Sequence, residues 1–293
     1  MEARNIVGAL ITLSLLVMAG CVQQERELHG SSGWLSYDEG IQEMKITEKP
    51  AILYFCSPDS DFCKLLEKEL FSNKTVSERM QDFVTIKIDV SDPSQEEVLS
   101  KYRFENIPFP LVIFLDNEEN ELSRLVAYSI YDPSAKGKSI NRFIEILNQT
   151  LHGEIVGEDF RFVTLDGEEK RLSDYRGKVV ILDLMSVNCP ACQIGMEFLS
   201  GVKDYYSDDQ DVVIISLDVA GDSVDAINSI FVDYVGEWEF GIDKYYEASS
   251  KYLLESAVPT IVIFDKYGRI FYLRAGVKTT QGLIDLIENV KGQ

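Results

Sequence analysis

The apolar run Val179-Val180-Ile181-Leu182-Asp183-Leu184-Met185 is followed, after three residues, by Cys189-Pro190-Ala191-Cys192. Nearly continuous apolar runs are typical of a central strand that is covered on both faces. The next segment, residues 193–206, has Met196, Leu199 and Val202 at helical spacing. These residues therefore predict a buried strand, a turn that carries two cysteines, and an amphipathic helix.

The rest of the second half continues as an α/β pattern. Residues 211–217 form another apolar run that predicts a second buried strand. Pro259 precedes a third strand, and a turn leads from it into a return strand and a closing amphipathic helix. The remaining elements are expected at residues 223–234 (helix), 245–252 (helix), 261–264 (strand), 269–274 (strand) and 281–290 (helix).

This order of elements resembles the thioredoxin superfamily, because the two cysteines lie between a strand and its helix and a proline opens a later strand. Residues 160–178 resemble the hairpin and lead-in of its TlpA-like and ResA-like branch, which comprises membrane-tethered thioredoxins of the extracytoplasmic face. The resemblance covers residues 154–293. It implies a central mixed β-sheet flanked by helices, and a dithiol that acts in the reducing direction.

The two cysteines of the motif are expected to differ in reactivity. Cys189 directly precedes a helix N-terminus, whose unpaired N–H groups and dipole favour a thiolate, so it is the predicted nucleophile. Cys192 lies one turn inside the helix and can resolve a mixed disulfide. Asp183 is expensive to bury and should have a raised pKa. The resemblance implies that Asp183 accepts a proton from the buried cysteine; a solvated Asp183 at the end of its strand is the alternative.

The first half repeats the plan over residues 33–151, before a junction near His152. Its lead-in at residues 34–50 and its segment 63–71 resemble the exported thioredoxins of the DsbD carboxy-terminal type. The fold class is therefore α/β, with two tandem thioredoxin-like domains at residues 33–151 and 152–293. Strands are predicted at residues 51–55, 83–90, 111–115 and 121–127, and helices at residues 62–70, 95–102 and 139–151.

The first half departs from the family at its active-site positions. Cys63 falls where the second active cysteine is expected, Ser60 replaces the first, and Tyr54 stands where Asp183 stands in the second half. Cys56 lies at the end of the preceding strand. Three interpretations stay open: a structural Cys56–Cys63 disulfide, an unusual redox pair, or vestigial thiols in a docking module.

Each half also contains a proline that the resemblance implies to be cis. In the second half this is Pro259, and Val258 before it is implied to pair through its backbone with a bound substrate strand. The alternative is a trans-proline that opens an edge strand. In the first half Pro110, or alternatively Pro108, takes this position.

The N-terminus carries a separate signal. The apolar run of residues 6–19 has 14 residues, fewer than the ~20 that span a bilayer as a helix, and is typical of a signal peptide. It ends in Val17-Met18-Ala19-Gly20-Cys21, which resembles the lipobox of prokaryotic lipoproteins. Residues 1–20 are thus the predicted signal peptide, Cys21 the lipidated residue and residues 21–32 a tether. The alternative is an uncleaved anchor in which Cys21 is incidental.

Length, charge and composition limit the classes of function that the chain can have. A length of 293 residues, 45% of them apolar, predicts two packed domains. The formal charge of −21 repels phosphate backbones, which argues against nucleic acid as a partner. The sequence has only two histidines, His29 and His152, and the CxxC lacks a second Cys or His pair that would complete four zinc ligands. We therefore expect no metal and no cofactor.

Together these features predict a thiol-disulfide oxidoreductase on the extracytoplasmic face of the cell membrane, acting on disulfides of exported proteins. By resemblance its task is cytochrome c maturation or disulfide repair, and its electrons come from a membrane donor of the DsbD or CcdA type. The alternative from another class is a membrane-tethered binding module in which Cys189–Cys192 is a static disulfide. A thiol peroxidase is disfavoured, because residues 185–188 lack the Pro-x-x-x-Thr-x-x-Cys loop usual for its nucleophile.

Cys21→Ala tests the anchor. Because the apolar run is too short to hold the chain in a bilayer as a helix, this variant is expected to leave the membrane fraction or to be mislocalised. Fractionation followed by N-terminal sequencing measures both location and processing. A variant that stays in the membrane fraction and keeps residues 1–20 would contradict the lipoprotein interpretation.

Overall fold

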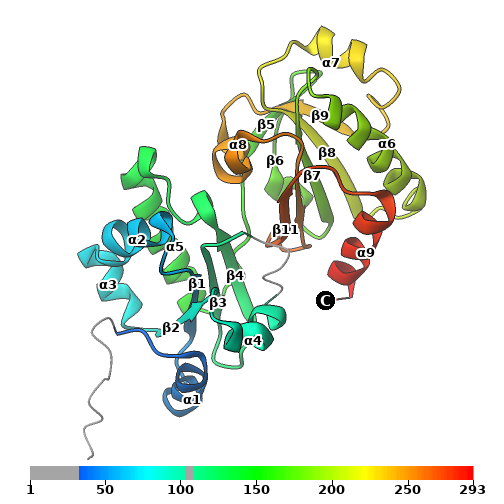
Figure 1. The fold of residues 1–293 in the computed structure, drawn as a ribbon. Helices are drawn as coiled ribbons and strands as arrows, with labels where there is room; N and C mark the ends of the chain where they lie inside the picture. The colour runs from blue at the N-terminus through cyan, green and yellow to red at the C-terminus, as the bar shows by residue number, and fades with distance from the viewer. Residues whose placement is uncertain (1–32, 103–107, 293) are drawn as a thin grey trace, which may run out of the picture. The chain divides into compact units, whose positions relative to one another are not determined.

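The computed structural model describes residues 33–102 and 108–292 (Figure 1). The predicted signal peptide, Cys21 and the tether lie outside the described residues. Within the part that is described, no helix is long and apolar enough to cross a membrane. Two mixed sheets flanked by helices are present in the described residues, one in each half of the chain, which confirms the predicted α/β class.

The first sheet has four strands in the order β2-β1-β3-β4. The central strand β1 pairs in parallel with β2 and antiparallel with β3, and β3 pairs antiparallel with β4. The strands are β1 (Ala51–Cys56), β2 (Val84–Asp89), β3 (Leu111–Leu115) and β4 (Glu121–Val126).

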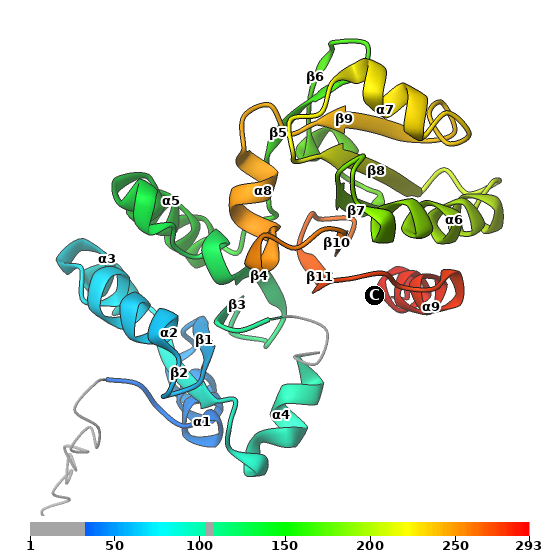
Figure 2. The same cartoon turned by 45° about the horizontal axis from the view of Figure 1, so that its top comes forward.

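Helices cover both faces of this sheet, which is why β1 is apolar throughout. Odd-numbered side chains of β1 pack with Met44 of α1 and with Tyr102 after α4, and even-numbered ones pack against the helices of the opposite face. Figure 2 shows α1 and α4 on one side and α2, α3 and α5 on the other. The helical elements are α1 (Tyr37–Thr47), α2 (Asp61–Leu66), η1 (Glu67–Phe71), α3 (Lys74–Met80), η2 (Pro93–Gln95), α4 (Glu96–Lys101), η4 (Ala127–Ser129), η5 (Pro133–Ala135) and α5 (Lys136–Leu151).

The second sheet has seven strands in the order β11-β10-β7-β8-β9-β5-β6. Its central strand β7 pairs in parallel with β8 and antiparallel with β10, as β1 does with β2 and β3. The strands are β5 (Arg161–Thr164), β6 (Glu169–Arg171), β7 (Val179–Met185), β8 (Val212–Asp218), β9 (Glu239–Ile242), β10 (Thr260–Phe264) and β11 (Ile270–Ala275).

The two faces of β7 are also both covered. Ile181 and Met185 lie on the face packed by α6 and α9, whereas Leu182 and Leu184 lie on the face packed by Ala248 and by other apolar residues. Figure 1 shows α6 and α9 on one side of this sheet and α8 on the other. The helical elements are η6 (Leu172–Tyr175), α6 (Pro190–Tyr205), α7 (Val224–Ile230), α8 (Glu247–Tyr252), η7 (Leu254–Ser256) and α9 (Thr280–Lys291).

The sequence analysis missed several elements, among them helices α1 and α3 and strand β9. Helix α3 begins after Asn73, whose side chain accepts hydrogen bonds from the N–H groups of Thr75 and Val76. Strand β9 has four residues and follows a turn, so it shows little periodicity. The helix expected at residues 223–234 ends at Ile230, because the chain turns there toward β9.

Candidate active site

The two cysteines of the second domain lie at the N-terminus of α6 and are joined in a disulfide. Cys189 is the N-cap, and its Sγ accepts a hydrogen bond from the N–H of Cys192 at 3.0 Å. Pro190 follows at the first helical position, where a missing N–H costs little. Cys189 is 9% exposed and Cys192 is 1% exposed. Of the two cysteines, Cys189 is therefore the more accessible.

A second loop comes close to this disulfide from the start of β10. The peptide bond between Val258 and Pro259 is cis, as the resemblance implied. The carbonyl oxygen of Val258 lies 3.5 Å from the Sγ of Cys189. The carbonyl of Pro259 accepts a 2.7 Å hydrogen bond from the N–H of Gly276, which follows β11. This bond ties the proline loop to the sheet.

Asp183 lies within β7 and is 2% exposed, so the alternative of a solvated carboxyl is wrong. It faces the same side of the sheet as Ile181 and Met185, which belong to the cluster that contains Cys192. Burial raises the pKa of Asp183 to about 7, although a hydrogen bond donated by the hydroxyl of Ser216 acts in the opposite direction. The carboxyl can therefore change protonation state near neutral pH.

The loop between β7 and Cys189 is held by Asp222, which the sequence analysis missed. Its Oδ2 accepts hydrogen bonds from the N–H of Val187 at 3.0 Å and from the hydroxyl of Ser186 at 3.1 Å. Asp218, at the end of β8, in turn accepts the N–H of Asp222. Burial and the neighbouring Asp222 carboxyl raise the pKa of Asp218 to about 6. The sequence signal that could have pointed to these contacts was Asp218, an aspartate that directly ends an apolar strand.

In the first domain Ser60 occupies the place of Cys189. It is the N-cap of α2, and its hydroxyl accepts the N–H of Cys63 at 3.3 Å, as Cys189 accepts that of Cys192. Cys56 and Cys63 are joined in a disulfide, with exposed fractions of 0% and 2%. This pair is thus bonded and buried, and the position equivalent to Cys189 holds the hydroxyl of Ser60.

Tyr54 occupies the place of Asp183. Tyr54 lies opposite Lys87 on the parallel strand β2, just as Asp183 lies opposite Ser216 on β8. Its hydroxyl donates to the carbonyl of Cys63 at 3.2 Å, and burial raises its pKa well above the ordinary range. A neutral phenol of this kind does not accept protons at neutral pH.

The cis-proline arrangement is nevertheless kept in the first domain. The peptide bond between Phe109 and Pro110 is cis, and the carbonyl of Pro110 accepts a 2.9 Å hydrogen bond from the N–H of Ala127, which follows β4. Of the two prolines considered from the sequence, Pro110 thus takes the position that Pro259 takes in the second domain.

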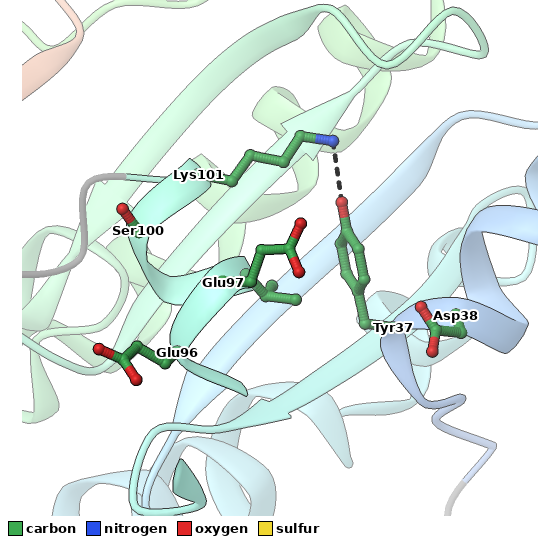
Figure 3. Close-up of a pocket in the computed structure, with 7 residues that line it drawn as sticks. Tyr37, Asp38, Glu96, Glu97, Ser100 and Lys101 are labelled. Atoms are coloured by element: carbon green, nitrogen blue, oxygen red, sulfur yellow. Dashed lines mark hydrogen bonds between the residues drawn. The ribbon is translucent and has the colours of Figure 1, made fainter. Parts of the chain in front are cut away.

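A large depression of about 940 Å³ lies elsewhere, between α1 and α4 (Figure 3). Its walls include Asp38, Glu96 and Glu97, and its Lys101 donates to the hydroxyl of Tyr37 at 2.9 Å. Lys101 is also ion-paired with a glutamate at 3.0 Å. No thiol lines this depression, so the candidate active site remains at the cysteines. Among the described residues, no group of three or more Cys, His, Asp or Glu side chains could hold a metal ion.

Both halves of the chain match known families. The family model described as AhpC/TSA family matches residues 156–273, and the model described as Thioredoxin-like domain matches residues 37–132. Both sets of boundaries agree with the two sheets.

Individual proteins are similar to parts of this chain. The thiol:disulfide interchange protein DsbD of Campylobacter jejuni is 30% identical over 87 residues, which is 30% of this chain but only 15% of that protein. The thiol-disulfide oxidoreductase ResA of Geobacillus kaustophilus is 27% identical over 133 residues, covering 45% of this chain and 75% of that protein. A solution structure titled as a putative thioredoxin from Neisseria meningitidis aligns with 47% of this chain and 90% of its own, at 18% identity and a TM-score of 0.42.

Asp183→Asn is expected to stabilise the second domain more at pH 8 than at pH 5. The carboxyl ionises near 3.8 when unfolded but near 7 when folded. The folded state therefore holds an extra proton between these values and loses stability as the pH rises through them. The gain at pH 8 is at most about 4 kcal/mol.

Urea unfolding followed by Trp238 fluorescence, in a Trp34→Phe background, reports on the second domain alone, because the chain has two tryptophans. An equal gain in the free energy of unfolding at both pH values would contradict a buried carboxyl that titrates near neutrality.

The two disulfides are expected to differ in their rate of reduction. Dithiothreitol should open Cys189–Cys192 at least about tenfold faster than Cys56–Cys63, because a thiolate must reach a sulfur to attack it. Timed alkylation and mass spectrometry of the native protein measure both rates, and denatured protein is the control in which the difference should vanish. Faster reduction of Cys56–Cys63 in the native protein would show that the first pair is accessible.

Proposed function

We propose, from the premise that both domains belong to the thioredoxin superfamily, that the second domain is a thiol-disulfide oxidoreductase centred on Cys189 and Cys192. The observation that carries this proposal is the position of the Cys189 sulfur at the N-terminus of α6, 3.5 Å from the carbonyl that precedes cis-Pro259. A sulfur at a helix N-terminus favours a thiolate, and a carbonyl beside it can pair with a peptide backbone.

The proposed exchange assigns one role to each residue. In the reducing direction, the Cys189 thiolate attacks a sulfur of the substrate disulfide, which breaks that bond and releases one substrate thiolate. Asp183 then takes the proton of Cys192. The Cys192 thiolate attacks the sulfur of Cys189 and expels the second substrate thiolate. The substrate gains two electrons, and Cys189–Cys192 ends as a disulfide.

Substrate binding is assigned to the cis-proline loop. The backbone of Val258 would pair with an extended segment of the substrate, and Pro259 would fix that segment beside the sulfur of Cys189. The hydrogen bond from Gly276 to the Pro259 carbonyl supports this role, because it holds the loop against the sheet.

The wider setting extends the same proposal. The substrates would be disulfides of exported proteins, in cytochrome c maturation or disulfide repair, and a membrane carrier of the DsbD or CcdA type would re-reduce Cys189–Cys192. The printed names of the relatives, an interchange protein and an oxidoreductase, support a disulfide pathway. Attachment through a lipid on Cys21 would keep the domains at the extracytoplasmic face of the membrane.

The first domain is proposed to have a supporting role without a dithiol cycle. A serine at position 60 cannot form a mixed disulfide, and the neutral phenol of Tyr54 cannot accept a proton at neutral pH. The Cys56–Cys63 bond fits a structural disulfide, because both cysteines are buried and the bond joins the end of β1 to α2.

Reduction of insulin by dithiothreitol tests the assignment. Cys189→Ser should lower the catalysed rate to the uncatalysed background, because no mixed disulfide can form. The matched pair Cys56→Ala with Cys63→Ala should keep the rate within about twofold of the unmodified chain, since neither sulfur takes part. Circular dichroism checks the fold of each variant.

Three results would contradict the proposal. An unmodified chain that leaves insulin oxidised would support the alternative of a static disulfide in a binding module. Consumption of peroxide in place of insulin reduction would favour a thiol peroxidase. Loss of more than about tenfold in the Cys56→Ala, Cys63→Ala variant would move the redox centre to the first domain.

A further inference from the structure

Three polar side chains form a hydrogen-bonded chain across β7 and β8 of the second sheet. The indole N–H of Trp238 donates to the Oγ of Ser216 at 3.1 Å. The hydroxyl of Ser216 donates to the Oδ2 of Asp183, also at 3.1 Å. Ser216 and Asp183 are direct neighbours on the two parallel strands, and Ser216 is fully buried.

The direction of this chain follows from the donors it contains. An indole nitrogen can only donate, so the Ser216 oxygen must accept from Trp238. The single hydroxyl proton of Ser216 is then directed to Asp183. A hydrogen bond donated to a carboxylate favours its ionised form, because protonation of the acceptor weakens the bond.

Neighbouring aromatic rings hold Trp238 in place. Its ring stacks on Phe240 with centroids 5.5 Å apart and lies 5.6 Å from Tyr234. Trp238 directly precedes β9, which pairs with β8 beside Ser216. The half-buried indole thus packs against two aromatic rings next to β9 and directs its N–H to Ser216.

We propose that Ser216 and Trp238 are positioning residues for Asp183 in the second domain. Their hydrogen bonds keep Asp183 able to take the proton of Cys192 at neutral pH. This inference rests on the proposed function, because it assigns the setting of the proton acceptor in that same exchange.

Few other polar groups face Asp183. Ile261 of β10 pairs with it on the other side and is apolar, and α6 contributes Cys192 to the same face. Asp218 lies on this face at the end of β8, with Asp222 beyond it. Burial raises the pKa of Asp183 to about 7 and that of Asp218 to about 6. A test must therefore assign the titration to Asp183 itself.

The first domain lacks this device at the equivalent positions. Lys87 stands where Ser216 stands, and its ammonium pairs with Glu67 at 2.7 Å and lies 5.7 Å from the centre of the Tyr54 ring. In the described residues the donor chain thus accompanies the buried carboxyl of the second domain and is absent where a phenol replaces it.

A carboxyl-carbon NMR titration of the whole chain tests the proposal directly. The oxidised protein is used so that neither Cys189 nor Cys192 titrates, and Asp183→Asn assigns the resonance. Ser216→Ala should raise the Asp183 midpoint by about one pH unit, since a hydrogen bond to the charged form is lost. Trp238→Phe should raise it by less, Ser216→Thr should restore it, and Trp34→Phe in the first domain is the matched control that should leave it unchanged.

The pH profile of insulin reduction supplies the second readout. Ser216→Ala should slow the reaction about tenfold near pH 6, where less carboxylate remains, and should leave the rate at pH 9 unchanged. In an Asp183→Asn background, Ser216→Ala should have no further effect.

Defined results would overturn the inference. The first is an Asp183 midpoint that moves by less than about 0.2 pH units in both Ser216→Ala and Trp238→Phe. The second is a folded Ser216→Thr variant whose midpoint shifts as much as that of Ser216→Ala. The third is a slowing of insulin reduction by Ser216→Ala that persists in the Asp183→Asn background. If the unmodified chain fails to reduce insulin, the proposed function is wrong. The NMR midpoints then still decide whether the hydrogen bonds from Trp238 through Ser216 set the ionisation of Asp183.

Discussion

A carboxyl group in the middle of a strand that is covered on both faces is the constraint on which the second domain depends. Asp183 lies between Ser216 on β8 and Ile261 on β10, and the elements that position the cysteines pack over the same face. Removing a carboxylate from water disfavours its charge, so the group titrates near neutrality instead of near pH 4. The sheet that buries the acid therefore also gives it a pKa that suits the proton transfer proposed for it, at a cost in stability above that pH.

The two domains separate the fold from its chemistry. Both have a central strand paired in parallel on one side and antiparallel on the other, an N-cap side chain that accepts the N–H three residues later, and a cis-proline whose carbonyl is held by the residue after the next strand. In the first domain a serine takes the place of the nucleophile, and a tyrosine takes the place of the buried acid. Because the backbone contacts do not require these side chains, the architecture persists without the redox centre.

The sequence was most informative where one local pattern determines the outcome. Continuous apolar runs identified the central strands, and the cysteine spacing together with a later proline identified the fold and the candidate site. Strand β9 could not be found in this way, because a short strand is defined mainly by its partners. Ser216 and Trp238 were missed for a related reason: they are 33 and 55 residues from Asp183 along the chain. Ser216 meets Asp183, and Trp238 meets Ser216, only after β7, β8 and β9 align. The sequence also left three interpretations of Cys56 and Cys63 open, because whether the two sulfurs meet depends on how β1 and α2 are placed.

The two buried aspartates of this site make different contacts because they lie at different positions along neighbouring strands. Asp183 lies inside β7, where a single serine hydroxyl is its polar contact and its charge is costly. Asp218 ends β8, where backbone N–H groups of the following turn reach it, and through Asp222 it supports the loop that leads to Cys189. Because Asp222 holds the N–H of Val187 and the hydroxyl of Ser186, the loop has fixed contacts that involve neither cysteine. In the proposed exchange, Cys189 can therefore change its bonding partner without breaking these contacts.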